Sequence, residues 1–510
     1  MRLVPAALTG WTVTAAGIVW PVGWVVAVLC VLLAAAAGVL LWRAERSASR
    51  IRAVGAGLLG MAAVGAGFGV AIALRADAVG DHAIGAAFGT VARVTVTPRE
   101  NAVSAGGGRI VFPATLQRVG THQTSGRVVV FAGTPGFGEV MVGRPAEFRA
   151  RITRPTRHDL TIAVLNATGE PRFGRAGPVS RAAHAVRGRF AAAARDALPA
   201  DRAALLPALV LGDTSTVSAA TRREFRTAGL THLTAVSGAN VTIVCGAALF
   251  SARLLGPRAA VGLAAAALMG FVIVVQPTAS VLRAAVMGAI ALLGVVSSRR
   301  RQAVPALSAT VLALLAVAPQ LAVDVGFALS VVATAALVVI APIWSRGMVA
   351  RGWPKPLADA WGIAWAAQVV TAPLIAGISG RLSLVAAAAN LVTAAVIAPI
   401  TVLGSAAAAL CAWWPAGAQL LIRFTGPELW WVLHVAHWSA GVPAASVPVP
   451  AGLPGVLLVG AAAVLTVALW RWRGFRAAMG WAIVVALACA LSWSLSGLLA
   501  PARIPDSAGR

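Results

Sequence analysis

Long runs of apolar residues dominate the chain, and each run predicts a helix that crosses a bilayer. A hydrocarbon core about 30 Å thick requires about 20 apolar residues per helix. Three such runs, at residues 3–20, 22–42 and 54–74, come first. After residue 230 apolar runs return almost without pause, at about 231–253, 259–277, 280–297, 303–318, 322–343, 357–378, 384–412, 426–441, 453–470 and 477–497. The pattern predicts a polytopic α-helical membrane protein with about thirteen transmembrane helices.

Residues 76–230 follow a different pattern, which predicts a soluble block. In residues 76–180, β-branched residues alternate with polar ones in short runs, as is typical of a small β-barrel or sandwich. These runs lie at 91–97, 109–112, 127–131 and 147–152. Residues 181–230 are rich in Ala and Arg at helical spacing, and Thr221 and Glu224 have the form of a capping box. We expect amphipathic helices at the membrane surface there.

Charge predicts the orientation. The chain is 59% hydrophobic and 11% charged, with a net charge of +26 that rests on arginine because Lys355 is the only lysine. When the predicted spans alternate, the cationic clusters fall on one side, near residues 43–52, 253–258, 299–301, 346–355, 423 and 471–476. Such an excess marks the cytoplasmic side. We therefore expect a multi-pass protein of the cell (cytoplasmic) membrane with a cytoplasmic N-terminus and an extracytoplasmic β domain.

These patterns divide the chain into five parts. We expect N-terminal transmembrane helices over 1–75, an extracytoplasmic β-rich domain over 76–180, surface helices over 181–230, a helical membrane domain over 231–498 and a tail over 499–510.

The sequence contains no recognisable motif for disulfide formation, ATP binding or metal-dependent catalysis. The cysteines lie far apart inside apolar runs and have no C-x-x-C spacing, so we expect neither disulfides nor metal ligands. Lys355 is followed by Pro356, so the chain has no Walker site for ATP. His434 and His437 have the spacing of metal ligands, but an aromatic-rich interfacial helix explains them as well. We expect no cofactor and no enzymatic activity.

Four ordered blocks resemble the signature of the ComEC family of competence DNA-uptake channel proteins. The blocks are Leu209–Asp213 with Phe225–Val241, Ser280–Met287, Asp324–Ser330, and Gln368–Pro373 with Asn390. The resemblance implies that the β-rich part is an OB-like domain and that residues 231–498 form the channel. It also implies channel-lining or motif roles for a set of polar residues: Asp213, His232, Ser237, Asn240, Arg283, Asp324, Gln368 and Asn390.

The sequence departs from the family pattern in three respects. Asn240 and Ala328 stand where many relatives have His and Gln. Many members also carry a C-terminal metallo-β-lactamase-like domain with an H-x-H-x-D-H metal site. The 510 residues of this sequence contain no such motif. We expect the channel part without that domain.

Polar residues inside apolar runs are informative because a charge at a helix centre costs about 2.5–3.5 kcal/mol. Arg283 and Asp324 stand near the outer starts of predicted helices, so we expect a charge pair or an arginine that guides phosphate. Extension of Arg283 to the membrane interface is the alternative. For His232, Ser237 and Asn240 both pore lining and ordinary interhelical hydrogen bonding remain open.

The predicted function is a transmembrane channel for uptake of single-stranded DNA during natural transformation. From Asp81 to Arg189 the chain has fifteen arginines against six acids, which suits a polyanion. The expected DNA-binding residues of the outer domain are Arg109, Arg127, Arg149 and Arg151. Expected partners are single-stranded DNA, membrane lipid, a separate cytoplasmic ATPase or DNA-binding protein, an extracytoplasmic DNA receptor and other copies of the chain. A secondary transporter or lipid-linked carrier and a membrane-embedded hydrolase are the alternatives.

Overall fold

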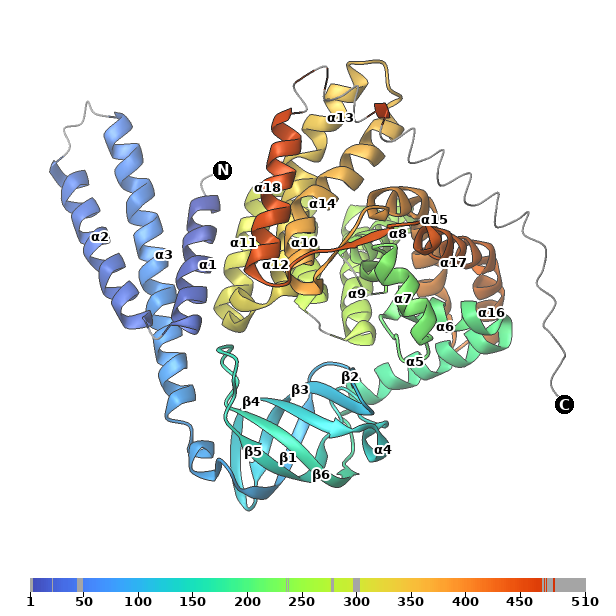
Figure 1. Cartoon of the computed structure of the whole chain (residues 1–510), viewed down its shortest axis with the longest axis horizontal. Helices are drawn as coiled ribbons and strands as arrows, with labels where there is room; N and C mark the ends of the chain where they lie inside the picture. The colour runs from blue at the N-terminus through green and yellow to red at the C-terminus, as the bar shows by residue number, and fades with distance from the viewer. Residues whose placement is uncertain are drawn as a thin grey trace, which may run out of the picture. The chain divides into compact units, whose positions relative to one another are not determined.

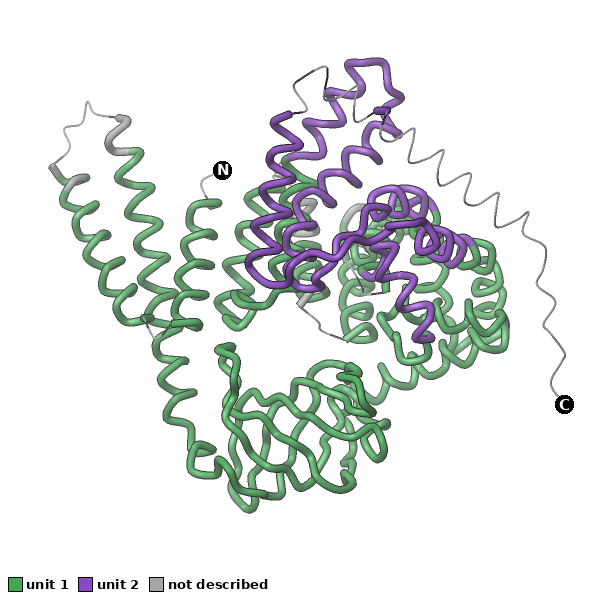
Figure 2. The backbone as a smooth tube through the Cα atoms, in the orientation of Figure 1, with its two compact units in different colours: residues 1–217, 232–339, 396–430 green, residues 218–231, 340–395, 431–510 purple. Residues whose placement is uncertain are grey.

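The computed structural model describes residues 3–20, 22–43, 49–234, 236, 238–276, 279–296 and 303–469, together with 472, 474, 480 and 481. Most of these residues are helical, and a small domain near the N-terminus is built of strands (Figure 1). The chain forms two compact units (Figure 2). Unit 1 comprises residues 1–217, 232–339 and 396–430, and unit 2 comprises residues 218–231, 340–395 and 431–510.

The first three predicted spans are helices. They are α1 (Leu3–Val19), α2 (Gly23–Arg43) and α3 (Ser49–Gly80), and α3 packs against both of the others. The indole of Trp11 in α1 donates a hydrogen bond to the carbonyl of Ala322 at 2.8 Å, and its ring centroid lies 5.2 Å from that of Phe327. This contact anchors α1 to the short helix η4 (Pro319–Val323).

A closed β-barrel follows α3 and the short helix η1 (Ala83–Ala87). Its strands are β1 (Val91–Pro98), β2 (Val103–Gly106), β3 (Arg109–Val119), β4 (His122–Gly133), β5 (Ala146–Thr153) and β6 (Ala163–Phe173). The strand order is β1-β5-β6-β4-β3, and β3 pairs again with β1, which closes the ring. Only the β4–β6 pair is parallel, and β2 forms a hairpin with β3 at the edge.

The barrel has its own apolar core because side chains alternate along each strand. In β3, Phe112, Ala114 and Leu116 are fully buried, while the residues between them are partly exposed. The short helix α4 (Thr134–Phe137) contributes Phe137 to this core. Burial of one face of every strand is what the period of two in the sequence predicts.

The four predicted β runs all lie in strands, but two strands were not predicted. Every residue of β2 is exposed, so its sequence has no alternation to detect. In β6 the alternation ends at Gly169, Glu170 and Pro171, which are typical turn and loop residues.

The barrel touches the helices of unit 1 through the loop between β5 and β6, residues 154–162. His158 Nδ1 donates to the carbonyl of Val19 at 3.0 Å. Leu160, in a left-handed conformation with φ of 62°, packs against a cluster of buried residues from α1, α3 and η4. These contacts fix the loop at the end of α1.

Residues 178–227 form three helices, of which two are amphipathic: α5 (Pro178–Ala197) and α7 (Ala219–Thr227). The third, α6 (Ala200–Leu211), is a buried helix, so the prediction that it is amphipathic is wrong, while its place at the membrane surface stays a prediction. Its apolar residues fall on all sides, which removes any polar face. The predicted capping box at Thr221 is also wrong, because Ser218 caps α7 and accepts from the N–H of Thr221 at 3.0 Å.

Apolar helices make up most of the rest of the described chain. They are α8 (Gly238–Ser251), α9 (Pro257–Val275), α10 (Ala279–Val296), α11 (Ala303–Val317), α12 (Val325–Val339), α13 (Ala341–Val349), α14 (Lys355–Ser379), α15 (Ala386–Leu410), α16 (Pro415–Phe424), α17 (Gly426–Gly441) and α18 (Leu453–Leu469). Within the described residues, five helical stretches are long and apolar enough to cross a membrane: Ala53–Ala87, Arg258–Val275, Val325–Val349, Lys355–Ser379 and Ala386–Leu410. The total of thirteen spans stays a prediction, and the expected span at 477–497 lies outside the described residues.

Candidate functional site

The first motif block forms the end of helix α6. Gly212 takes the left-handed conformation, with φ of 69°, which suits glycine because it has no Cβ, and its N–H bonds to the carbonyl of Ala208 at 3.1 Å. Asp213 follows, and its Oδ1 accepts from both the N–H and the hydroxyl of Ser215, at 3.2 and 2.6 Å. Its Oδ2 lies 3.6 Å from a guanidinium nitrogen of Arg187. Asp213 is therefore a structural partner of a buried arginine.

Arg187 joins three helices. Its side chain, on α5, is 8% exposed and donates to the carbonyl of Leu211 at 2.9 Å and to that of Val274 at 3.2 Å. These carbonyls end α6 and α9, where helices have unsatisfied acceptors and a partial negative charge. Burial lowers the pKa of the Arg187 guanidinium, and the Asp213 carboxylate opposes that shift. The guanidinium stays charged at neutral pH.

Asn240 also binds the end of α6. It is 4% exposed on α8, and its Nδ2 donates to the carbonyl of Leu209 at 3.0 Å. The structure thus brings Asp213 and Asn240, two of the predicted residues, to the same helix end. His232 lies exposed in the short helix η2 (Thr231–Leu233), and Ser237 lies outside the described residues.

Arg283 and Asp324 interact electrostatically. Arg283, on α10, is only 2% exposed, and the negative charge of the Asp324 carboxylate attracts its guanidinium. Asp324 is exposed and caps α12, accepting from the N–H of Phe327 at 2.6 Å. The deep burial of Arg283 does not fit a side chain that extends to the surface. Burial raises the pKa of Glu100, in the loop after β1, and the nearby carboxylate of Asp324 raises it further.

In unit 2, Gln368 and Asn390 stand on neighbouring helices in the sequence. Gln368, on α14, lies 3.5 Å from the carbonyl of Ser383 in the short strand β7 (Arg381–Ser383), which pairs with β8 (Ser446–Pro448). Asn390 is half-buried on α15. The hydroxyl of Ser383 donates to the carbonyl of Thr227 at 2.7 Å.

Gly229, in the second motif block, permits a close contact. It has φ of 73°, and a Cβ at this position would clash with Ala386 at the start of α15. This contact explains a glycine here without any role in catalysis or binding.

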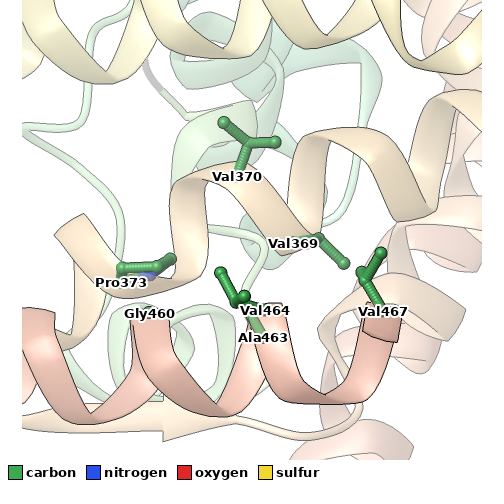
Figure 3. Close-up of a pocket in the computed structure, with 7 residues that line it drawn as sticks. All are labelled: Val369, Val370, Pro373, Gly460, Ala463, Val464 and Val467. Carbon is green, nitrogen blue, oxygen red and sulfur yellow. The ribbon is translucent and has the colours of Figure 1, made fainter. Parts of the chain in front are cut away.

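The block Gln368–Pro373 also borders an apolar groove between α14 and α18 (Figure 3). Val369 and Pro373 of α14 point toward Gly460 and Val464 of α18 beside a cavity of about 340 Å³. No polar side chain of the described residues lines it.

The two histidines of α17 make separate contacts. His437 Nδ1 lies 2.9 Å from a carboxylate oxygen of Glu224, and the His434 ring packs edge-on against Trp438 with centroids 5.8 Å apart. The described residues contain no group of three or more His, Cys, Asp or Glu that could hold a metal ion.

The predicted arginines of the β domain fall on different parts of the barrel. Arg149 and Arg151 are exposed on β5, and Arg149 lies opposite Arg93 of β1. Arg127, on β4, lies opposite Thr115 of β3. They form no single patch.

Arg109 takes part in a row of residues around the outside of the barrel. The register pairs Phe131 of β4 with Val111 of β3 and with Asn166 of β6, and Asn166 pairs with Arg151 of β5. The Arg109 guanidinium lies 5.7 Å from the centroid of the Phe131 ring. Phe131 is half-buried on the outer face, whereas Phe112 and Phe148 are buried in the core. We call Arg109, Phe131, Asn166 and Arg151 the outer row.

Sequence reasoning missed Arg187 and Asn166. Arg187 interrupts the buried stripe of α5, which otherwise holds Ala183, Phe190 and Ala194, and a lone charge on such a stripe is the available signal. Asn166 lies in a strand that was not predicted, so the sequence offered no means of placing it.

Comparison with known proteins gives one match. No curated protein and no solved structure matches the chain. The family model described as Competence protein matches residues 209–474, just over half of the chain, and it includes all four motif blocks. The chain therefore belongs to the competence protein family, whose members are associated with DNA uptake in transformation.

Proposed function

We propose that this protein is a channel in the cytoplasmic membrane that passes one strand of DNA into the cell. Membership of the competence family supports a role in DNA uptake, and the apolar helices support a place in a membrane. To these two observations we add the proposal that the protein forms a channel and that DNA moves inward through it. Because the chain lacks a Walker motif, a separate cytoplasmic ATPase or DNA-binding protein supplies the pull.

In this proposal the β domain is an OB-like barrel that receives the strand outside the membrane. Such barrels bind oligonucleotides on their second and third strands and on the loops after the first and fourth. In the ring of this chain these correspond to β3, β4, the connection at 99–108 that contains β2, and the loop at 154–162. The loop at 154–162 contacts α1, so a DNA strand bound on this face of the barrel would lie next to helices of unit 1.

The outer row is the observation that carries the proposal. Proteins that bind single strands without sequence preference combine arginines for the phosphates with aromatic rings on which bases stack. Phe131 supplies a ring on the outer face, Arg109 lies beside it, and Arg151 lies two strands away. The amide of Asn166 stands between the ring and Arg151 and can bond to a base edge.

Four charged residues, an arginine at each end and two carboxylates between them, lead from this face toward the helices. Burial raises the pKa of Glu100, the guanidinium of Arg127 lowers it, and the carboxylate of Asp324 raises it again. The Asp324 carboxylate in turn attracts the buried guanidinium of Arg283. We propose that phosphates exchange with these carboxylates as the strand moves, because each arginine then always has an anionic partner.

The test compares variants of the full-length protein in lipid nanodiscs. Replacing Phe131 by Leu removes the ring and keeps an apolar side chain, and a stacked base contributes about 1–3 kcal/mol. Because leucine keeps part of the contact with the base, we expect the lower end of this range, a fall of roughly five- to tenfold in the affinity for a labelled single-stranded oligonucleotide. Arg109→Gln should also lower the slope of log affinity against log salt by about 0.7.

Arg175→Gln is the matched control, because Arg175 is exposed and lies beyond β6, away from the outer row. It should change neither quantity. In cells, deletion of the gene should abolish uptake of labelled DNA into the cytoplasm, and Phe131→Leu should reduce it. Normal uptake in the deletion strain would refute the function, whereas normal binding by Phe131→Leu would refute only this surface.

A further inference from the structure

A cleft lies between α3 and α11, two helices that each pack against the neighbouring helix α1. Both make extensive contacts with α1, and Thr14 of α1 is among the residues that line the cleft. The cavity measures about 290 Å³, and most of the residues that line it are apolar, among them Val64, Ile72 and Leu315. The Thr14 hydroxyl already donates to the carbonyl of Gly10 at 2.6 Å, so the cleft is apolar along most of its length.

One end of the cleft carries a positive charge. Arg75 reaches from α3 to the carbonyl of Ala316 in the last turn of α11, at 3.1 Å. The guanidinium has several N–H donors, of which this carbonyl uses one. Arg75 is exposed, and no carboxylate of the described residues forms an ion pair with it.

The length of the cleft matches one leaflet of a bilayer. Val64 and Arg75 are eleven residues apart on α3, which corresponds to about 16 Å at a rise of about 1.5 Å per residue. Half of a hydrocarbon core about 30 Å thick is about 15 Å. Arg75 directly follows Leu74, where the apolar run of α3 ends, so we expect its charge at the depth of the lipid phosphates.

We propose that this cleft binds one phospholipid molecule, with an acyl chain along α3 from Val64 to Ile72 and the phosphate on Arg75. A guanidinium binds phosphate with paired hydrogen bonds, and the apolar walls suit a hydrocarbon chain. The ligand chemistry is that of a phosphodiester joined to an acyl chain, and the headgroup beyond the phosphate is not recognised. The lipid fills the gap between α3 and α11 and holds the first three helices against the rest of unit 1.

Glycines of α3 allow a matched test. A Cβ at Gly67 meets nothing within 4 Å, so the side chain of Gly67→Leu has room to enter the cleft. Gly57 is equally open and lies on the same helix, about 15 Å away along its axis and outside the cleft. Both changes raise helix propensity equally, so a difference between the two variants reports the cleft.

The experiment is native mass spectrometry of the full-length protein released from nanodiscs of defined phospholipid. The wild type and Gly57→Leu should retain one phospholipid more than Gly67→Leu. Arg75→Gln should bind that lipid roughly tenfold more weakly, as expected for loss of a charge-assisted hydrogen bond, and excess inorganic phosphate should not displace it. Equal retention by Gly67→Leu and the wild type would overturn the proposal. Displacement by inorganic phosphate alone would show a simple anion site and would overturn it too.

Discussion

Arg187 should contribute far more to stability than its acidic partner, Asp213. Replacement of Arg187 by Met keeps much of the side-chain volume but removes the donors to the carbonyls of Leu211 and Val274. A buried acceptor left without a partner costs about 1–3 kcal/mol. Two such acceptors give a destabilisation of about 2–6 kcal/mol, to which the partly exposed ion pair adds at most about 1 kcal/mol.

Replacement of Asp213 by Asn should cost only about 1 kcal/mol. The Asp213 side chain is 28% exposed and lies 3.6 Å from Arg187, so water screens the pair. Asparagine keeps an oxygen for the two bonds from Ser215. Arg187 keeps its carbonyl acceptors at the ends of α6 and α9.

Denaturant unfolding in detergent micelles, with membrane abundance as a second readout, measures the difference. The double variant should be about as stable as Arg187→Met, because Arg187→Met has already removed the ion pair that Asp213→Asn would break. Arg187→Lys should be intermediate, because an ammonium keeps the charge but cannot span two helix ends. Equal losses for Arg187→Met and Asp213→Asn would refute the reasoning, since they would make the ion pair and not the carbonyl contacts decisive.

Three further outcomes are expected. A reporter fused near Gly126 should be active only outside the cell and one near Arg351 only inside, as the positive-inside rule requires, and a cytoplasmic signal at Gly126 would reverse the orientation. Gly229→Ala should lower stability by about 1–3 kcal/mol, because alanine disfavours the left-handed backbone and its methyl group would meet α15; unchanged thermal unfolding would contradict this. Arg283→Ala and Asp324→Ala should each reduce membrane abundance or DNA uptake, and the double variant should be less damaged than their sum, whereas strict additivity would show that the charges act independently.

The apolar pattern predicts the helices well because a bilayer leaves few alternatives. A spanning segment must satisfy its backbone hydrogen bonds internally, so long apolar runs become helices. The run at 322–343 shows the limit of this argument. Its first residues form η4, and α12 starts only at Val325, because the carboxylate of Asp324 caps it.

The candidate residues were found by type, but their partners could not be predicted. Asn240 was a candidate because it is polar within an apolar run. Its partner, however, is the backbone carbonyl of Leu209, and every residue type has such a carbonyl. Phe112, Phe131 and Phe148 were equivalent in sequence as aromatic residues of β runs. Only the register of the closed barrel separates the outward ring of Phe131 from the two buried rings.

The loop at 154–162 gives the barrel a mechanical role. The barrel continues from α3 on one side and into α5 on the other, and this loop adds a third attachment through His158 and Leu160. The left-handed backbone of Leu160 costs about 1–3 kcal/mol, which its packing among buried residues of the helices offsets. A domain held at three points cannot swing on a single tether. Tension on any chain bound to it is therefore carried into α1, α3 and α5 together, and none of these helices bears the load alone.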